Sequence, residues 1–124
     1  MKITWMRTGA DGRTTFEDLQ IATTRGERGD ETPLLQIDGV FFRTGQPALD
    51  MDFHNAPRRQ LVIPLGGELE VEVGDGTVRH IGTGDALLAD DLDGQGHKSR
   101  FIPDGATVVF AVLPEDADPS AWRA

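Results

Sequence analysis

Histidine is the side chain best suited to moving a proton near neutral pH, and the chain has 3 of them, at His54, His80 and His97. His54 and His97 stand at the two ends of a run of short apolar segments separated by glycine turns. A small antiparallel barrel brings the ends of such segments into one cavity. We therefore expect His54 and His97 to share a cavity, as candidate catalytic residues. His80 follows a hairpin signal and is expected to face solvent.

Two adjacent arginines, Arg58 and Arg59, lead into an apolar segment of an otherwise acidic chain. Side chains alternate between the two faces of an extended segment, so one arginine should point inward and the other outward. An inward Arg58 would present a planar guanidinium to a carboxylate or phosphate. The alternative is a surface salt bridge to a neighbouring strand that carries Glu68, Glu70 and Glu72.

The same alternation groups further side chains with His54. If His54 faces a barrel interior, the residues at even positions around it face the same way, provided that Pro57 does not interrupt the extended run. These residues are Asp52, Ala56, Arg58 and Gln60, with Val62 as an apolar wall. We therefore expect Asp52, Arg58, Gln60 and Val62 to contribute to ligand binding.

An acidic loop, Asp90-Asp91-Leu92-Asp93, is followed by Gly94 and Gly96. It is expected at the mouth of the barrel, as a lid, a weak cation site or a solvated turn, and its charge favours the solvated turn. Serine and threonine show no spacing typical of a catalytic triad, and no glycine-rich phosphate loop precedes a helix.

The elements that must position these residues are short strands. Period-two alternation or buried β-prone runs between Gly, Asp and Pro turns predict strands at 2–7, 34–37, 39–45, 61–65, 69–73, 78–81, 86–89 and 107–113. Strand 2–7 is expected at the edge or start of a sheet, and 16–22 is either a helical turn or a strand. The polar segment 23–33 is expected to be a mobile surface loop, and the acidic tail 114–124 to be loose, with Trp122 able to dock. No segment carries a helical apolar stripe, so the pattern predicts a single all-β domain, a barrel or double-sheet jelly roll, over residues 1–124.

Composition excludes several partner classes. The formal charge of −9 disfavours nucleic acid and anionic membranes, and the lack of cysteine excludes disulfides and thiolate zinc sites. The N-terminus does not resemble a signal peptide, and no segment approaches the roughly 20 apolar residues of a spanning helix, so a cytoplasmic location is expected. The run Leu61-Val62-Ile63 is apolar at consecutive positions. It therefore needs cover on both faces. A barrel interior would cover one face and a partner sheet or a second subunit the other, so a homodimer through 61–65 is plausible.

The order of residues from 48 to 101 resembles the cupin superfamily of small jelly-roll barrels. In the first cupin motif, His54 matches the first histidine, while Ala56, Gln60 and Gly67 take the places of the second histidine, the glutamate and the closing glycine, and Ala48 that of the opening glycine. In the second motif, Gly84 matches the opening glycine, and His97 lies two residues beyond the position of the motif histidine. Asp90 and Leu92 replace the proline and glycine of this motif, and Phe101 stands where its asparagine would fall. The turn Gly82-Thr83-Gly84-Asp85 also resembles a turn common in cupins, and the strings around His54 and His97 resemble a subgroup of small bacterial cupins. The resemblance implies a cupin-type double-stranded β-helix with its motif core at 48–101.

The resemblance also implies a metal site. Cupin metals such as Fe, Mn, Ni or Zn are held by two or three histidines and one carboxylate. Here the set would be His54, His97 and the amide oxygen of Gln60, with Asp52 or Asp91 as substitutes for the missing carboxylate. The alternative is that the histidines are hydrogen-bonded in a polar cavity without metal.

These observations predict a cupin whose cavity binds a small anionic organic molecule, with a weakly held divalent metal as an option. His54, His97, Arg58 and Gln60 would line it, with Leu69 or Val71 as further apolar wall. One alternative is a metal-dependent oxygenase, isomerase or lyase. Another is a non-catalytic sensor or interaction module.

Overall fold

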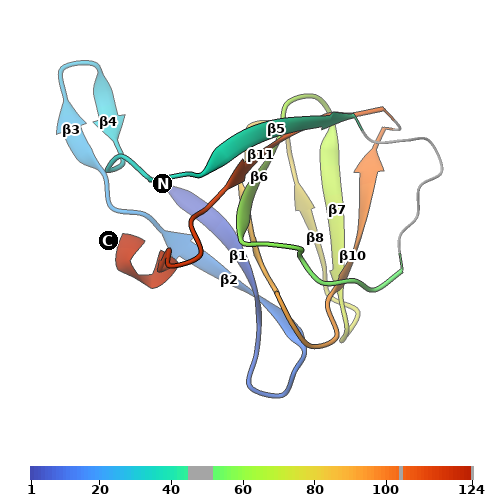
Figure 1. The fold of residues 1–124 in the computed structure, drawn as a ribbon. Coiled ribbons are helices and arrows are strands. Elements are labelled where there is room, and N and C mark those ends of the chain that lie inside the picture. Colours follow the sequence, from blue (N-terminus) through green and yellow to red (C-terminus); the bar gives the residue numbers. More distant parts are fainter. Residues whose placement is uncertain (45–51, 104, 124) are drawn as a thin grey trace.

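The computed structural model describes residues 1–44, 52–103 and 105–123, and within them the chain is almost entirely β-structure (Figure 1). The strands are β1 (Lys2–Thr8), β2 (Thr14–Gln20), β3 (Thr24–Gly26), β4 (Gly29–Glu31), β5 (Gly39–Thr44), β6 (Gln60–Pro64), β7 (Glu68–Val73), β8 (Val78–Ile81), β9 (Leu87–Asp90), β10 (His97–Ile102) and β11 (Thr107–Val112). One short 3-10 helix, η1 (Pro119–Trp122), follows β11. In these residues no helix has the length and apolarity needed to cross a membrane.

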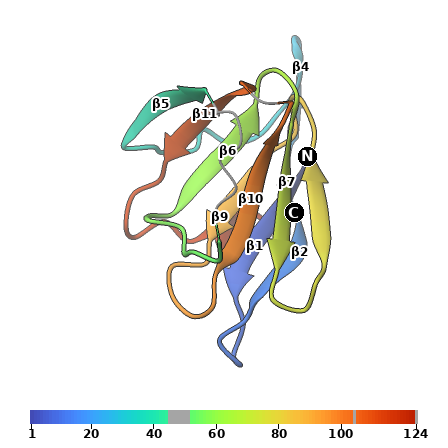
Figure 2. The same cartoon turned by 90° about the vertical axis from the view of Figure 1, so that its right-hand side faces the viewer.

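Two sheets make up the body of the molecule, and Figure 2 shows them after a turn of 90°, from the side on which β7 and β10 lie. The larger sheet has 6 strands in the order β2-β1-β9-β6-β11-β5, and the smaller has 3 in the order β10-β7-β8. From β6 onward, successive segments alternate between the sheets, except at the hairpin that joins β7 to β8. This is the double-sheet jelly roll that the sequence predicts.

The space between the sheets holds the first apolar core. Met6, Val62 and Phe110 point into it from the larger sheet, and Leu69 and Val71 from the smaller one. The alternation expected in 69–73 is confirmed, because Leu69, Val71 and Val73 are all buried. One part of this layer is not filled by side chains, and it forms the cavity described below.

A second core covers the outer face of the larger sheet. Trp5, Leu61 and Leu88 lie in it, and Trp122 of η1 packs against it. The expected docking of Trp122 is thus confirmed, while the looseness of the rest of the tail and the homodimer remain predictions. On this face Leu61 and Ile63 of β6 lie in the same apolar cluster as Ala117 and Trp122 of the tail. Along its two edges, β6 pairs with β9 and β11.

Four further local predictions can be compared with the structure. β1 lies between β2 and β9 and is not an edge strand, and the ambiguous 16–22 falls largely in β2. Segment 23–33 contains the exposed hairpin β3–β4, which stands away from the body in Figure 1. Residues 34–37 form no strand. Leu34 is 89% exposed, so burial of its side chain does not offset the conformational entropy that an ordered strand would lose.

Candidate functional site

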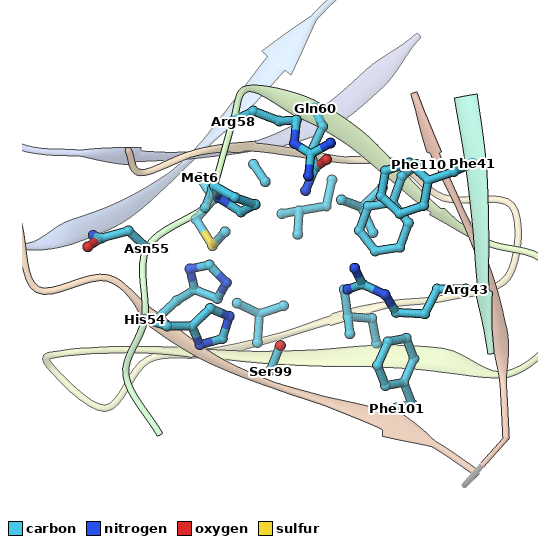
Figure 3. A pocket seen from close by; sticks show the side chains of 18 residues that line it. Met6, Phe41, Arg43, His54, Asn55, Arg58, Gln60, Ser99, Phe101 and Phe110 are labelled. Atoms are coloured by element: carbon cyan, nitrogen blue, oxygen red, sulfur yellow. The ribbon is translucent and has the colours of Figure 1, made fainter. Parts of the chain in front are cut away.

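A cavity of about 480 Å³ lies between the two sheets. Its wall is mostly apolar, with a small number of polar side chains from several elements, as is typical of small-molecule sites. The polar lining residues are Arg43, His54, Asn55, Arg58, Gln60, His97 and Ser99, and the larger apolar ones are Met6, Phe41, Val62, Leu69, Val71, Leu87, Phe101 and Phe110. Figure 3 shows His54 on one side of this space and Arg43, Phe41 and Phe110 on the other.

The segment that enters β6 supplies one wall, largely as the alternation predicts. His54, Ala56, Arg58, Gln60 and Val62 all line the cavity. Gln60 is buried, and its Oε1 has no hydrogen-bond partner in the described part of the chain. Asp52, which was expected on the same face, is exposed and outside the lining, where its carboxylate accepts the backbone N–H of Phe53.

His54 and His97 lie side by side because their backbones pair. Each N–H donates to the carbonyl of the other at 2.9 Å, and the two imidazole rings have centroids 4.5 Å apart. Gly96 makes this approach possible, since its φ is +82° and a Cβ there would stand 2.2 Å from the carbonyl oxygen of His54. Both rings line the cavity, so the sequence correctly brings them together.

The ring of His97 is held by a buried carboxylate. Asp91 is fully buried, and its Oδ2 lies 2.5 Å from Nδ1 of His97 and accepts a 3.1 Å hydrogen bond from the hydroxyl of Thr14. A carboxylate at Nδ1 keeps the proton on that nitrogen and leaves Nε2 as the free basic atom. His54 is oriented in a similar way, because its Nδ1 donates to the backbone carbonyl of Asp52 at 2.9 Å.

The expected solvated turn at 90–93 is therefore wrong for Asp91, although Leu92 and Asp93 are exposed. The side-chain amide of Asn55 donates to the carbonyls of Asp93 and Gly94 and holds this loop against the cavity wall. A signal for Asp91 was present in the sequence. Leu87 and Ala89 of β9 point into the core, and alternation along the chain predicts that the side chain at position 91 points the same way.

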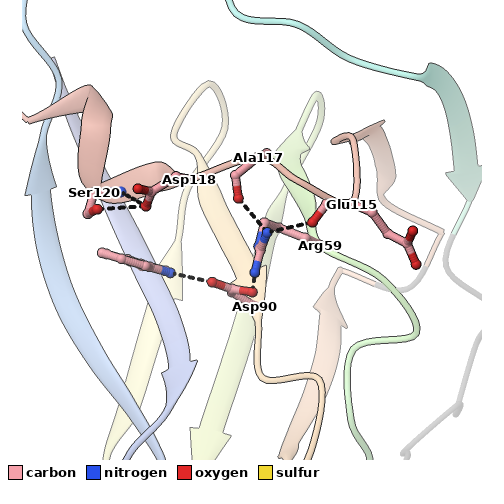
Figure 4. Close-up of polar contacts among 7 residues, drawn as sticks. Arg59, Asp90, Glu115, Ala117, Asp118 and Ser120 are labelled. Carbon is pink, nitrogen blue, oxygen red and sulfur yellow. Dashed lines mark hydrogen bonds and ion pairs between the residues drawn. The ribbon is translucent and has the colours of Figure 1, made fainter.

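The side chains of Arg58 and Arg59 point to opposite faces of the chain, as the alternation predicts. Arg58 lines the cavity, whereas Arg59 points to the opposite face and donates to Asp90 at 2.7 Å (Figure 4). Arg59 also donates to the carbonyls of Ala117 and Glu115 in the tail. The expected alternative of salt bridges to the strand of Glu68 and Glu70 is wrong for both arginines, since those glutamates contact His80 and Arg100.

Arg43 is a lining residue that the sequence reasoning missed. It comes from β5, where it shares the inward face with Phe41. Its Cζ lies 4.7 Å from the ring centroid of Phe110, and the rings of Phe41 and Phe110 stack at 4.7 Å. The only sequence signal was its position two residues after Phe41 in a predicted strand.

His80 lies outside the cavity, as expected. It is exposed, and its Nδ1 is 2.9 Å from Oε1 of Glu68. The motif position Ala48 falls in 45–51, outside the described residues.

The donor set does not fit the metal site that the cupin motif implies. Among the described residues, the cavity lining offers two imidazoles and the amide of Gln60, but no carboxylate. Across the described ranges no group of three His, Asp or Glu side chains is placed to hold a metal ion. Asp91 contacts His97 at the Nδ1 atom, so it orients this ring and does not complete a set of ligands around the cavity.

No protein-family model matches the chain, and no curated protein sequence matches it. Two solved structures share its fold. A double mutant of the QdtA 3,4-ketoisomerase from Thermoanaerobacterium thermosaccharolyticum, in complex with TDP, aligns over 82% of this chain and 81% of its own, with 15% identity and a TM-score of 0.52. A 3,4-ketoisomerase from Helicobacter canadensis aligns over 84% of this chain and 85% of its own, with 15% identity and a TM-score of 0.50. At such identities the likeness shows the fold alone, and it confirms the cupin-type jelly roll.

Proposed function

We propose that this protein binds a small organic anion in the barrel cavity and catalyses a proton transfer on it, with His97 as the general base and acid. The observation that carries the proposal is the buried pair of Asp91 and His97 at the wall of a ligand-sized cavity. A carboxylate of this kind fixes the tautomer of the imidazole and stabilises the imidazolium that forms when Nε2 takes a proton.

The chemistry that best suits this arrangement is isomerisation next to a carbonyl. Such a reaction removes a proton from one carbon and delivers a proton to a neighbouring atom, so one or two imidazoles suffice. His54 and His97 supply two rings with centroids 4.5 Å apart on one wall. The two structural neighbours are named as 3,4-ketoisomerases, and moving a carbonyl between adjacent carbons is a reaction of this class.

Arg58 would hold the anionic group of the ligand. Its guanidinium points into the cavity in Figure 3, and none of the described lining residues is a carboxylate that could neutralise it. An arginine fork binds carboxylate or phosphate oxygens through two parallel hydrogen bonds. The apolar residues between Arg58 and the histidines would enclose the rest of the molecule.

The test uses two anionic hydroxyketones, dihydroxyacetone phosphate and hydroxypyruvate, incubated with the protein in D2O. We expect ¹H NMR to show exchange of the C–H protons next to the carbonyl of at least one of them, at a rate well above that in buffer. His97→Ala should abolish the exchange while isothermal titration still detects binding, and Arg58→Ala should weaken binding. Equal exchange rates with wild type and His97→Ala would contradict the role of His97, and no binding of either compound would count against the proposal.

A non-catalytic binding module is the second candidate. The observation that favours it is the presence of Ala56 and Gln60 at the positions where the cupin motif has histidine and glutamate, both in the cavity wall. Binding without exchange for wild type would support this candidate.

A homodimer and a cytoplasmic location also remain predictions for this protein. Sedimentation at micromolar concentration tests the first, and a monomer would contradict it. Since β6 lies within its own sheet, a dimer would have to use another surface.

A further inference from the structure

The two arginines of the cavity differ from most other arginines of this acidic chain. Six arginines outside the cavity each form an ion pair with a carboxylate: Arg7, Arg25, Arg59, Arg79, Arg100 and Arg123. Arg43 and Arg58 form neither an ion pair nor a side-chain hydrogen bond with any described residue, although the chain has 21 acidic residues. The cavity is therefore a place where the sign of the local charge is opposite to that of the whole protein.

Both guanidinium groups are held beside the same ring. The Cζ atoms of Arg43 and Arg58 each lie 5.6 Å from the ring centroid of Phe41, so they are no farther apart than twice that distance. Contact with an aromatic ring orients a guanidinium and leaves the N–H groups at its edge available. Arg43 comes from β5 and Arg58 from the segment before β6, and Figure 3 shows both pointing into the cavity.

We propose that the ligand carries a phosphate monoester, bound as a dianion between Arg43 and Arg58. This inference rests on the proposed function, because it names the anionic group for the same cavity. A phosphate monoester has a charge of about −1.5 to −2 at pH 7 and three terminal oxygens, enough to accept hydrogen bonds from two arginine forks. A singly charged group would neutralise only one of the two cations. The apolar wall formed by Val62, Leu69 and Val71 then encloses the uncharged part of the molecule.

Three probes with one phenyl ring separate charge from shape: phenyl phosphate, phenyl sulfate and phthalate. Phenyl sulfate has the same tetrahedral shape as phenyl phosphate with one charge fewer, and phthalate has two charges on separate carboxylates. By isothermal titration at pH 8 we expect phenyl phosphate to bind wild type at least about tenfold more tightly than either of the others. Its affinity should rise between pH 5 and pH 7.5, because its second ionisation falls at about 6. The affinity of phenyl sulfate should not change in this way.

Arg43→Ala and Arg58→Ala should each remove most of the preference for phosphate over sulfate. Arg43→Gln provides a second variant that keeps the stem packed beside Phe41. Arg100→Ala is the matched control, because Arg100 is an exposed arginine outside the cavity lining and should leave the preference intact. Circular dichroism checks that each variant is folded.

The outcomes separate this inference from the proposed function. Equal affinities of phenyl phosphate and phenyl sulfate, both lowered by Arg58→Ala, would overturn the phosphate assignment and leave anion binding in place. Phthalate binding as tightly as phenyl phosphate, or a preference that survives in the Arg43 variants, would also overturn the assignment. If no probe binds wild type, the phosphate assignment and anion binding in this cavity both fail.

Discussion

Asp91 and His97 lie six residues apart in the chain, and Oδ2 of the fully buried Asp91 approaches Nδ1 of His97 to 2.5 Å. The pair is formed by a loop that leaves β9 and returns to β10, so the carboxylate holds the ring at Nδ1 while His97 lines the cavity. His97 is therefore oriented by a residue that does not itself line the cavity.

The first prediction follows from this contact. Asp91→Asn removes the charge that fixes the imidazole tautomer, so ¹⁵N NMR should no longer show His97 as a single Nδ1-protonated form. Any exchange activity should fall by at least about tenfold, as loss of a histidine-orienting carboxylate does in hydrolases, while ligand binding should persist. Asp93→Asn is the matched control, because the side chain of Asp93 is exposed in the same loop. An unchanged tautomer in Asp91→Asn would show that the contact does not orient the ring.

The second prediction concerns the contact between Arg59 and the tail. Arg59 joins Asp90, whose side chain is only 9% exposed, to the carbonyls of Ala117 and Glu115. Arg59→Ala removes the donor to Oδ1 of Asp90 and to the two carbonyls, while Oδ2 of Asp90 keeps its hydrogen bond from Trp5. Urea denaturation should therefore show a loss of about 2 kcal/mol in the free energy of unfolding. Arg100→Ala breaks an exposed ion pair with Glu70 and should cost less than about 0.5 kcal/mol. Equal losses for the two variants would mean that Arg59 does not anchor the tail.

The third prediction compares two glycines with nearly the same backbone angle. Gly67 has φ +87° and Gly76 has φ +88°, but a Cβ at 67 would lie 2.4 Å from the carbonyl oxygen of Ile102, whereas no heavy atom lies within 4 Å of one at 76. Gly76→Ala should cost only the left-handed strain, about 1–2 kcal/mol. Gly67→Ala should cost clearly more, because the backbone of the β10 end must move as well. Thermal unfolding of the two variants measures the difference, and similar midpoints would contradict the steric argument.

The fourth prediction is a pH dependence at η1. The side chain of Asp118 accepts hydrogen bonds from the hydroxyl and backbone N–H of Ser120, and these bonds lower the pKa of Asp118 below its ordinary value of 3.8. The stabilisation of the helix start by ionised Asp118 is therefore complete above pH 3.8 and is lost as the pH falls through the lowered pKa. The amide resonance of Ser120 should titrate with a midpoint below 3.8 and should lose this transition in Asp118→Asn. A midpoint at or above 3.8 would contradict the cap.

The fifth prediction tests the alignment with the cupin motif. Ala56 and Gln60 both line the cavity with His54 and His97. Ala56→His combined with Gln60→Glu should complete a set of three histidines and one carboxylate and bind Ni²⁺ at least about tenfold more tightly than wild type. Gln60→Glu alone serves as the control. If calorimetry shows no gain for the folded double variant, these positions do not converge as they do in metal-binding cupins.

The sequence predicts those features of the site that depend on alternation within one strand. The inward positions of His54, Arg58, Gln60 and Val62 follow from that rule. The burial of Asp91 was missed because its charged neighbours indicate a solvated loop, and only its hydrogen bonds to Thr14 and His97 offset the cost of burying it.

Features that depend on contacts across the fold were not predictable in this way. Arg43 reaches the cavity because β5 pairs with β11, and the tail is held near Leu61 by Arg59, by Trp122 and by the ion pair of Arg123 with Glu17. Neither pairing has a local signal, since each joins segments far apart in the chain.

The separate roles of the adjacent residues Arg58 and Arg59 have an evolutionary consequence. One side chain faces the ligand cavity and the other fastens the tail, although the two codons are adjacent. Substitutions at 58 can therefore change which ligand binds with little effect on folding. Substitutions at 59 are limited by the stability of the fold, whichever ligand the cavity binds. A single-residue insertion or deletion between 55 and 59 would exchange the two faces and disturb both tasks at once, so this short segment should accept point changes far more readily than changes in length.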